Sequence, residues 1–257
     1  MGTDKERPAP GARARKWCRD ARAAVCDVNE TWEHGTVVRA TRYPAYYDYN
    51  VVLVEGDPAM SAEQLIAAAD AGLEGLEHRR LDFEEADAAE AVRADLESVG
   101  WETTRLSWML HSEPLPADAG IEIENVDYDS VRELRVAWHY EEFPPELDPS
   151  DYLDAAREVA MRRAVQVIAT RDGGDLVGYA QIERIGATAE IDQVYVLPRH
   201  RGAGLGAALT RAAIEAAADA ADLWIVADDE GRPKELYHRL GFRPAWTSVE
   251  FLRLPRA

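Results

Sequence analysis

The sequence is poor in the features that mark membrane, secreted and metal-binding proteins. Its 257 residues include only two cysteines, Cys18 and Cys26, and no run approaches the ~18 apolar residues of a membrane-spanning helix. The N-terminus lacks the apolar stretch of a secretory signal. The cysteines form no metal-ligand pattern, and the six histidines are scattered. We therefore expect a cytoplasmic protein with free thiols and without a metal.

Positive charge is also scarce. Lysine and arginine total 29 against 48 acidic residues, which gives a net charge of −19. Such a molecule repels nucleic acid and anionic membranes, so neither is an expected partner. It attracts cations such as amines, although an acidic surface is more often only a solubility device. The 47% of hydrophobic and 30% of charged residues are typical of packed globular domains.

Two segments without apolar periodicity divide the chain. Residues 1–15 combine proline, glycine and basic residues and predict a loose tail, and a helix is expected around Lys16–Asn29. The segment Glu113–Gly120 contains two prolines and a glycine, and we place a domain boundary there. The prediction is an N-terminal domain over residues 16–115 and a second domain over residues 120–257.

The second half alternates helix and strand signals. The expected strands are Ile121–Val126, Val165–Thr170, Leu176–Ile185, Ala189–Leu197, Leu223–Ala227 and Thr247–Leu254. The expected helices are Ser130–Trp138, Asp151–Arg163, one that follows a glycine-rich segment, and one from Pro233 to Leu240. Asp172-Gly-Gly-Asp175 is a strong hairpin turn. The pattern predicts an α+β fold with a mixed, mostly antiparallel sheet flanked by helices.

The first half contains a shortened copy of this order. Its expected elements are a strand at Val51–Val54, a helix that begins at the capping box Ser61-Ala-Glu-Gln64, a strand at Arg79–Phe83, a helix that ends near Ser98, and a strand at Thr103–Leu110. Gly100-Trp101 takes the place that Gly241-Phe242 holds in the second half. The first half has no counterpart of the glycine-rich segment, so we expect two related half-domains and one cofactor site.

The glycine-rich segment is Arg201-Gly-Ala-Gly-Leu-Gly206, between a predicted strand and a predicted helix. Unpaired N–H groups and the helix dipole favour an anion at such a place, and glycines let the backbone approach a pyrophosphate closely. Arg201 adds a positive charge suited to phosphate. A tight strand-to-helix turn accounts for one glycine but poorly for three at alternate positions.

A dinucleotide site is a competing interpretation, because Gly202–Ala207 also fits the pattern G-x-G-x-x-G/A. That pattern belongs directly after a parallel strand, whereas Pro198–Arg201 intervene here and the preceding strands look like antiparallel hairpins. Only about fifty residues follow, which are too few for the rest of a nucleotide-binding fold. A P-loop is excluded because no Gly-Lys-Ser/Thr follows.

Three segments together resemble the GNAT acetyltransferase superfamily: Val194-Tyr-Val196, Arg201-x-x-Gly204-x-Gly206 and Tyr237-His-Arg-Leu-Gly-Phe242. The resemblance covers residues from about 121 to 254, and the two-half layout resembles tandem members with one degenerate half. It implies that the loop backbone holds the pyrophosphate of acetyl-CoA and that the strand pairs with the pantetheine arm. The implied cofactor-binding residues are Val194, Tyr195, Val196, Arg201, Gly202, Ala203, Gly204, Leu205, Gly206 and Ala207.

The resemblance also suggests catalytic residues for N-acetylation of a small amine or an exposed amino group. Tyr237 matches the position that protonates the leaving thiolate, and Glu190 matches a general base. Asp192 shares a strand face with Glu190 and is a rival base, and a backbone N–H near Val196 is the implied oxyanion donor. For Tyr237 the alternative is a packed helix residue, and for the two acids it is a solvated sheet face.

Two departures from the family pattern keep a second function open. Glu230 stands where the family often has asparagine, and Pro233 stands where a small residue is usual. A catalytically idle module that binds acyl-CoA and regulates another process is therefore an alternative. Glu141 and Glu142 lie in a region that shapes the acceptor pocket in the family, where they could hold a cation or form an acidic surface loop. The sequence leaves oligomerisation open.

Overall fold

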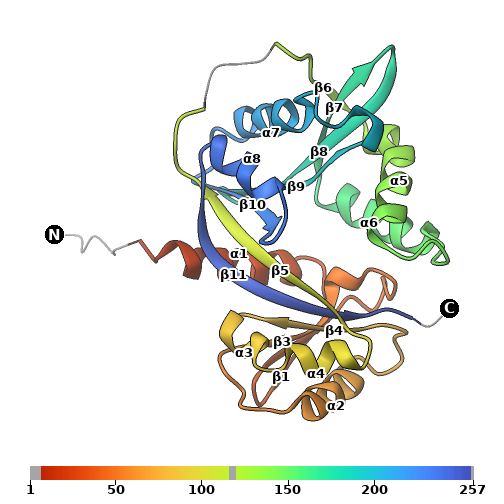
Figure 1. Cartoon of the computed structure of the whole chain (residues 1–257), viewed down its shortest axis with the longest axis vertical. Coiled ribbons are helices and arrows are strands. Elements are labelled where there is room, and N and C mark those ends of the chain that lie inside the picture. The colour runs from red at the N-terminus through yellow and green to blue at the C-terminus, as the bar shows by residue number, and fades with distance from the viewer. Residues whose placement is uncertain (1–6, 116–119, 256–257) are drawn as a thin grey trace.

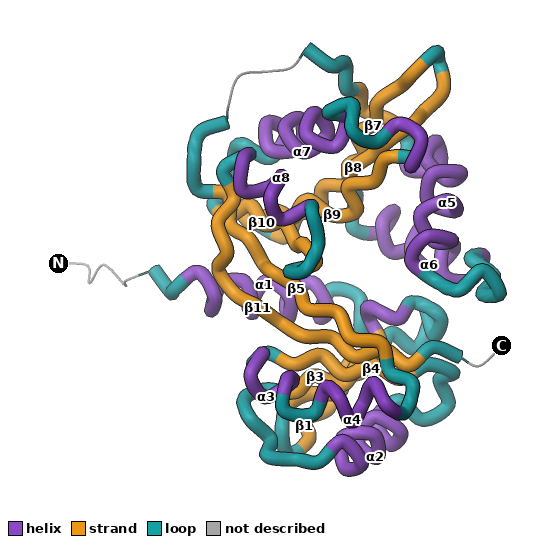
Figure 2. The backbone as a smooth tube through the Cα atoms, in the orientation of Figure 1, coloured by secondary structure: helices purple, strands orange, loops and turns teal. Residues whose placement is uncertain are grey.

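The computed structural model describes residues 7–115 and 120–255, whose strands form one continuous sheet (Figures 1 and 2). Its eleven strands are ordered β1-β2-β3-β4-β11-β5-β10-β9-β8-β7-β6. They are β1 (Val28–Trp32), β2 (Gly35–Arg39), β3 (Asn50–Val54), β4 (Arg79–Phe83), β5 (Glu102–His111), β6 (Glu124–Val126), β7 (Gln166–Asp172), β8 (Asp175–Ile185), β9 (Thr188–Val196), β10 (Asp222–Asp228) and β11 (Phe242–Arg253). Among the described strand pairs, β3–β4 and β9–β10 are parallel and the others are antiparallel. The predicted α+β fold with a mixed, mostly antiparallel sheet is confirmed.

The two halves interlock at the centre of this sheet. Strand β5 ends the first half, yet it pairs with β10 on one side and with β11 on the other. Strand β11 ends the second half, yet it lies between β4 and β5 of the first. Figure 1 shows β5 and β11 running side by side where the halves meet. Each half therefore supplies its last strand to the other half's part of the sheet.

The copy of the second half that the sequence indicates in the first is visible in the structure. Helix α2 (Ala62–Gly72) connects the parallel strands β3 and β4, as α7 (Leu205–Ala216) connects the parallel strands β9 and β10. The capping box predicted at the start of α2 is present. In both halves a glycine with positive φ and a buried aromatic residue mark the start of the last strand: Gly100-Trp101 directly precedes β5, and Phe242, after Gly241, is the first residue of β11.

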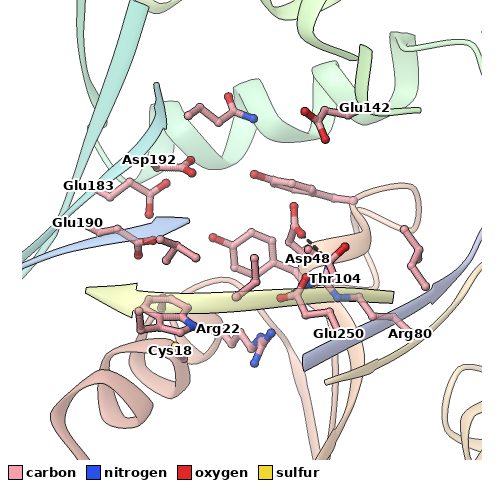
Figure 3. Close-up of a pocket in the computed structure, with 18 of the residues that line it drawn as sticks. Cys18, Arg22, Asp48, Arg80, Thr104, Glu142, Glu183, Glu190, Asp192 and Glu250 are labelled. Carbon is pink, nitrogen blue, oxygen red and sulfur yellow. Dashed lines mark hydrogen bonds and ion pairs between the residues drawn. The ribbon is translucent and has the colours of Figure 1, made fainter. Parts of the chain in front are cut away.

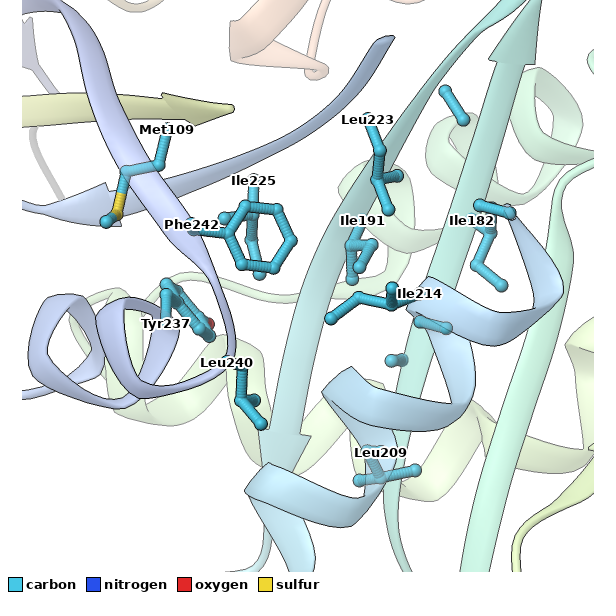
Figure 4. Close-up of a cluster of buried hydrophobic side chains, with 14 of the residues drawn as sticks. Met109, Ile182, Ile191, Leu209, Ile214, Leu223, Ile225, Tyr237, Leu240 and Phe242 are labelled. Carbon is cyan, nitrogen blue, oxygen red and sulfur yellow. The ribbon is translucent and has the colours of Figure 1, made fainter. Parts of the chain in front are cut away.

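Helices cover the sheet on both faces. In the second half, α7 and α8 (Pro233–Arg239) enclose an apolar core that includes Leu209, Ile214, Tyr237 and Phe242 (Figure 4). The opposite face is covered by α5 (Arg132–Glu142) and α6 (Ser150–Arg162), which follow the 3-10 turns Tyr128–Val131 and precede β7. In the first half, a separate core lies under α2, α3 (Ala86–Glu90) and α4 (Arg93–Ser98). The 3-10 turn Tyr47–Tyr49 leads into β3.

The predicted loose tail is wrong from residue 10 onward, because α1 spans Pro10–Ala23. Proline at the first helical position starts this helix. Ala14 and Trp17 are buried against Trp224 of β10, and Arg13 forms an ion pair with Asp222 at 2.9 Å. Tertiary packing therefore orders a segment whose composition suggests disorder.

Several boundaries differ from the sequence predictions. The helix expected over Lys16–Asn29 ends at Ala23, because the chain turns into the hairpin β1–β2, which the sequence did not indicate. Strand β11 begins at Phe242 rather than Thr247, and β6 is shorter than expected. Residues 1–6 of the predicted tail and 116–119 of the predicted boundary lie outside the described residues, so the domain limits stay predictions. No helix in the described parts of the chain is long and apolar enough to cross a membrane.

Candidate active site

The glycine-rich loop connects β9 to α7, as the sequence predicts. A 3-10 turn, Pro198–His200, leads through Arg201 to Gly204, the N-cap residue of α7, which has a φ of +84°. Gly202 has a φ of +82°, and a Cβ atom there would meet no atom within 4 Å. The four residues 201–204 are exposed. The backbone therefore leaves an open cradle at a helix N-terminus, which suits a phosphate group.

Arg201 is held by the protein in a way that the sequence does not reveal. Its Nε donates to the carbonyl of Val196 at 2.8 Å, and its Nη2 contacts Glu141 Oε2 at 2.6 Å. Its guanidinium lies 5.6 Å from the centre of the Tyr195 ring, and the Tyr195 hydroxyl donates to the same Glu141. Glu141 therefore partly neutralises the charge that the sequence assigns to phosphate binding. Ala203, between the loop glycines, is exposed beside it.

Strands β9 and β10 separate just before the loop. Their parallel pairing ends at Ile191 and Ile225, while β10 continues alongside β5 and β9 continues alongside β8. A bulge at Gln193, which has a φ of +47°, bends β9 at this point. The Gln193 side chain is fixed there by hydrogen bonds from Gln181, Arg135 and Tyr179. Among the described strands, Val194–Val196 thus has no partner on its β10 side, where the family resemblance places the pantetheine arm.

The structure brings Glu190 and Asp192 together at this split. Both are partly buried, and the indole N–H of Trp17 donates a hydrogen bond to Glu190 Oε2. Burial and the neighbouring Asp192 raise the pKa of Glu190 to about 8. Burial, Glu183 and Asp48 raise the pKa of Asp192 to about 7, against the lowering effect of Arg135. Both carboxyl groups thus titrate close to neutral pH, where a general base is most effective.

The two carboxyl groups face a cavity of about 410 Å³ between the halves (Figure 3). Small-molecule sites commonly have this size. Seven acidic residues line it: Asp48, Glu102, Glu142, Glu183, Glu190, Asp192 and Glu250. Seven aromatic residues also line it: Trp17, Tyr46, Tyr49, Trp108, Trp138, Phe143 and Tyr152. Carboxylates and aromatic faces both attract a cation, so the cavity favours a positively charged ligand.

The two arginines that line the cavity, Arg22 and Arg80, are committed to protein carboxylates. Arg80 contacts Asp48 at 2.6 Å, Asp82 at 2.8 Å and Glu250 at 2.6 Å, and Arg22 also contacts Asp82. Arg80 is buried, with 6% of its surface exposed. Their charges therefore hold the carboxylates in place and are poorly placed to receive an anionic ligand.

Tyr237 lies on α8, as predicted, but with its ring in the core. It is 6% exposed, and its ring meets that of Phe242 edge to face at 6.2 Å (Figure 4). Burial and Asp192 raise the pKa of its hydroxyl. Tyr237 is not among the residues that line the described cavity. Its role as an acid, like the roles predicted for the loop and β9 residues, stays a prediction.

The sequence did not indicate that the first half contributes to this site. Trp17, Cys18, Asp48 and Arg80 come from the first half, and Glu250 comes from β11, which lies within the first half's part of the sheet. Each is remote in sequence from Glu190. The sequence offered one indirect signal: an acidic residue on a predicted strand is seldom buried unless another group pairs with it.

A model of the acetyltransferase (GNAT) family matches residues 128–242. These residues belong to the GNAT family. The matched residues include the loop before α7, the split between β9 and β10, and both carboxyl groups whose pKa values are raised, Glu190 and Asp192. Membership of the GNAT family implies acyl transfer from an acyl-CoA. No curated protein sequence matches the chain significantly.

Solved structures share the fold over nearly the whole chain, beyond the GNAT match itself. A conserved protein of unknown function from Staphylococcus epidermidis has a TM-score of 0.66 at 17% identity, covering 88% of this chain and 93% of its own. A GCN5-related N-acetyltransferase from Kribbella flavida has a TM-score of 0.57 at 18% identity, covering 95% of each chain. A GCN5-related N-acetyltransferase from Sphaerobacter thermophilus has a TM-score of 0.55 at 16% identity, covering 95% and 93%. The two-half architecture is therefore shared with these proteins.

Proposed function

We propose that this protein is an N-acetyltransferase that transfers the acetyl group of acetyl-CoA to a primary amine bound in the cavity between its halves. The observation that carries the proposal is the position of Glu190 and Asp192. Both carboxyl groups line the cavity and have raised pKa values, and both lie on β9 beside its split from β10. The strand continues from them to the cradle before α7.

The donor is expected to bind along this strand. The pyrophosphate of acetyl-CoA suits the exposed loop N–H groups at residues 201–204, and the pantetheine arm suits the unpaired edge at Val194–Val196. This path directs the thioester toward Glu190 and Asp192 at the split. The residues thus fit acetyl-CoA, which supplies the acyl group and a thiolate leaving group.

The amine enters as an ammonium ion and must lose a proton before it attacks. Glu190 or Asp192 accepts that proton, directly or through water, and the neutral nitrogen forms a bond to the thioester carbonyl carbon. Collapse of the tetrahedral intermediate breaks the carbon–sulfur bond and releases CoA thiolate. A backbone N–H near Val196 stabilises the oxyanion, and Tyr237 supplies the proton that the thiolate takes up. The second proton of the amine leaves to solvent.

Thermal shift and thiol release test this function. Acetyl-CoA and CoA are expected to raise the melting temperature, whereas NAD(H) leaves it unchanged. Release of CoA thiol is then expected to depend on added primary amine. Stabilisation by NAD(H) alone would contradict the proposal. Binding of acetyl-CoA without amine-dependent thiol release across a broad amine panel would instead support a non-catalytic acyl-CoA-binding module.

A further inference from the structure

We infer that the acceptor of the proposed acetyl transfer is a small diamine, a primary amine that carries a second positive charge. The inference rests on the proposed function and assigns the second cation to a site in the first half, at Asp48 and Glu250. Five of the seven carboxylates that line the cavity form two groups on opposite sides of it, and Glu102 and Glu142 belong to neither (Figure 3). Glu183, Glu190 and Asp192 form the group on β8 and β9, and Asp48 and Glu250 face it from across the cavity.

The β8–β9 group is short of positive charge. Glu183 forms an ion pair with Arg163 at 2.6 Å. Within the described parts of the chain, Glu190 accepts a hydrogen bond from one side chain, the neutral indole of Trp17. Asp192 has no ion pair within 4 Å among the described residues. Among the described residues, Arg163 is thus the one guanidinium paired with this group within 4 Å, and Arg135 acts on Glu183 and Asp192 only from farther away. An ammonium ion in the cavity would stabilise the ionised forms of Glu190 and Asp192.

Carboxylates also outnumber arginines around Asp48 and Glu250, on the other side of the cavity. Arg22 and Arg80 lie among three carboxylates, those of Asp48, Asp82 and Glu250. Burial raises the pKa of Glu250 to about 7 despite the lowering effect of Arg80. A single cationic group would balance this excess. An acceptor with a carboxylate at this end would meet the same excess charge and be repelled.

The walls between the two groups suit the rest of such a ligand. Tyr152 donates to Asp48 Oδ2 at 3.1 Å, which fixes that carboxylate at the cavity surface. The rings of Tyr46 and Tyr152 lie edge to face with centres 5.1 Å apart, and Trp138 lines the same cavity. Aromatic faces accommodate methylene groups and also attract ammonium ions. The cavity thus has a carboxylate group on each side and an aromatic wall, which matches a short chain with two amines.

Three acceptors with equal four-carbon chains test the inference on the wild-type protein. They are 1,4-diaminobutane, butylamine and 4-aminobutanoate, which carry a positive, a neutral and a negative group at the far end. We expect kcat/KM for the diamine to exceed that for butylamine by about tenfold or more, with 4-aminobutanoate the poorest acceptor. Three- and five-carbon series show the optimal spacing. Equal kcat/KM for diamine and monoamine at every length would overturn the inference.

Variants then locate the second site. Asp48→Asn and Glu250→Gln are expected to lower the ratio of kcat/KM for the diamine to that for butylamine by about tenfold each. Glu63→Gln removes an exposed carboxylate of the same half outside the cavity, and its ratio is expected to stay at the wild-type value. A wild-type ratio in folded Asp48→Asn and Glu250→Gln proteins would overturn the inference while leaving the proposed function intact. Failure of every amine, with acetyl-CoA still bound, would overturn both.

Discussion

The indole N–H of Trp17 donates a hydrogen bond to the carboxylate of Glu190, which lies 173 positions later in the chain. Trp17 is 3% exposed and belongs to α1, whereas Glu190 lies on β9 of the GNAT domain. A hydrogen bond to the ionised form of an acid lowers its pKa, and this bond opposes the effect of burial on Glu190. The N-terminal helix thus tunes the candidate base of the other half.

Replacement of Trp17 by phenylalanine is expected to raise the pKa of Glu190 further, because the ionised carboxylate loses its donor. A base must be deprotonated to act, so the acid side of the pH profile of kcat/KM moves to higher pH. Activity at neutral pH then falls by about tenfold. Trp32→Phe is a matched control, because its indole donates to the Leu53 carbonyl at 3.0 Å, outside the cavity. An unchanged pH profile in Trp17→Phe would contradict the effect of Trp17 on the pKa of Glu190.

Single substitutions of the two carboxylates distinguish the rival bases. Loss of the true base is expected to lower kcat by at least about 100-fold, and loss of the other to have a smaller effect. If Glu190 is the base, the wild-type rate increases with pH through about 8, and Glu190→Gln abolishes that step. If Asp192 is the base, the step lies near 7 and Asp192→Asn abolishes it. Glu215→Gln, an exposed position on α7, is the control.

The cradle before α7 is tested by Gly202→Ala. The residue has a φ of +82°, which an alanine adopts at a cost of about 1 kcal/mol, and the added methyl group enters the open space assigned to pyrophosphate. Affinity for acetyl-CoA, measured by calorimetry, is expected to fall. Gly56→Ala controls for backbone strain, because Gly56 has a φ of +69° and similarly open surroundings in the first half. Equal effects of both variants on affinity would contradict binding of the pyrophosphate at the loop before α7.

Much of the fold could be predicted from the sequence, because local signals and tertiary packing agree there. The capping box at Ser61 and the strand Arg79–Phe83 are both confirmed, and so is the hairpin turn at Asp172-Gly-Gly-Asp175. The helix of α1 could not be predicted at Pro10, because contacts with remote residues stabilise it. The composition of residues 1–15 does not indicate such contacts.

The sequence predicted only the part of the candidate site that comes from the second half of the chain. Glu190 was predicted because it matches the general base of the GNAT family that the sequence resembles, and Asp192 because it shares a strand face with Glu190. Asp48 and Glu250 reach the same cavity through the interlocked strands β5 and β11, and no pattern in the sequence specifies that strand order. The raised pKa values depend on this burial and therefore also required the structure.

The raised pKa values predict an unusual dependence of stability on pH. Glu190, Asp192 and Glu250 have pKa values of about 8, 7 and 7 in the folded state, above those of unfolded chains. Between the unfolded and the folded pKa values the folded protein binds more protons than the unfolded one, so these groups make the free energy of unfolding decrease as pH rises from about 5 to about 8. Chemical denaturation measures the slope. Glu190→Gln is expected to flatten it, and a free energy that rises over this interval would contradict the burial of these acids.

Tyr237→Phe tests the predicted general acid. If the phenol protonates the leaving thiolate, kcat is expected to fall by about 100-fold with little change in acetyl-CoA affinity. The substitution keeps the ring that packs on Phe242, so the core is preserved. Unchanged kcat would mean that Tyr237 serves only in packing. A melting temperature close to the wild-type value would show that a fall in kcat comes from the lost hydroxyl group and is not caused by damage to the core.

The most direct test of the account is the rate of thiol release from bound acetyl-CoA when a primary amine is added to the wild type and to the Glu190→Gln, Asp192→Asn double variant. The two proteins are compared at equal occupancy by acetyl-CoA. The wild type is expected to release thiol in proportion to the acetylated amine formed, and the double variant to bind acetyl-CoA without amine-dependent release. Equal rates in the two proteins, or no release from the wild type with any amine, would contradict the assignment.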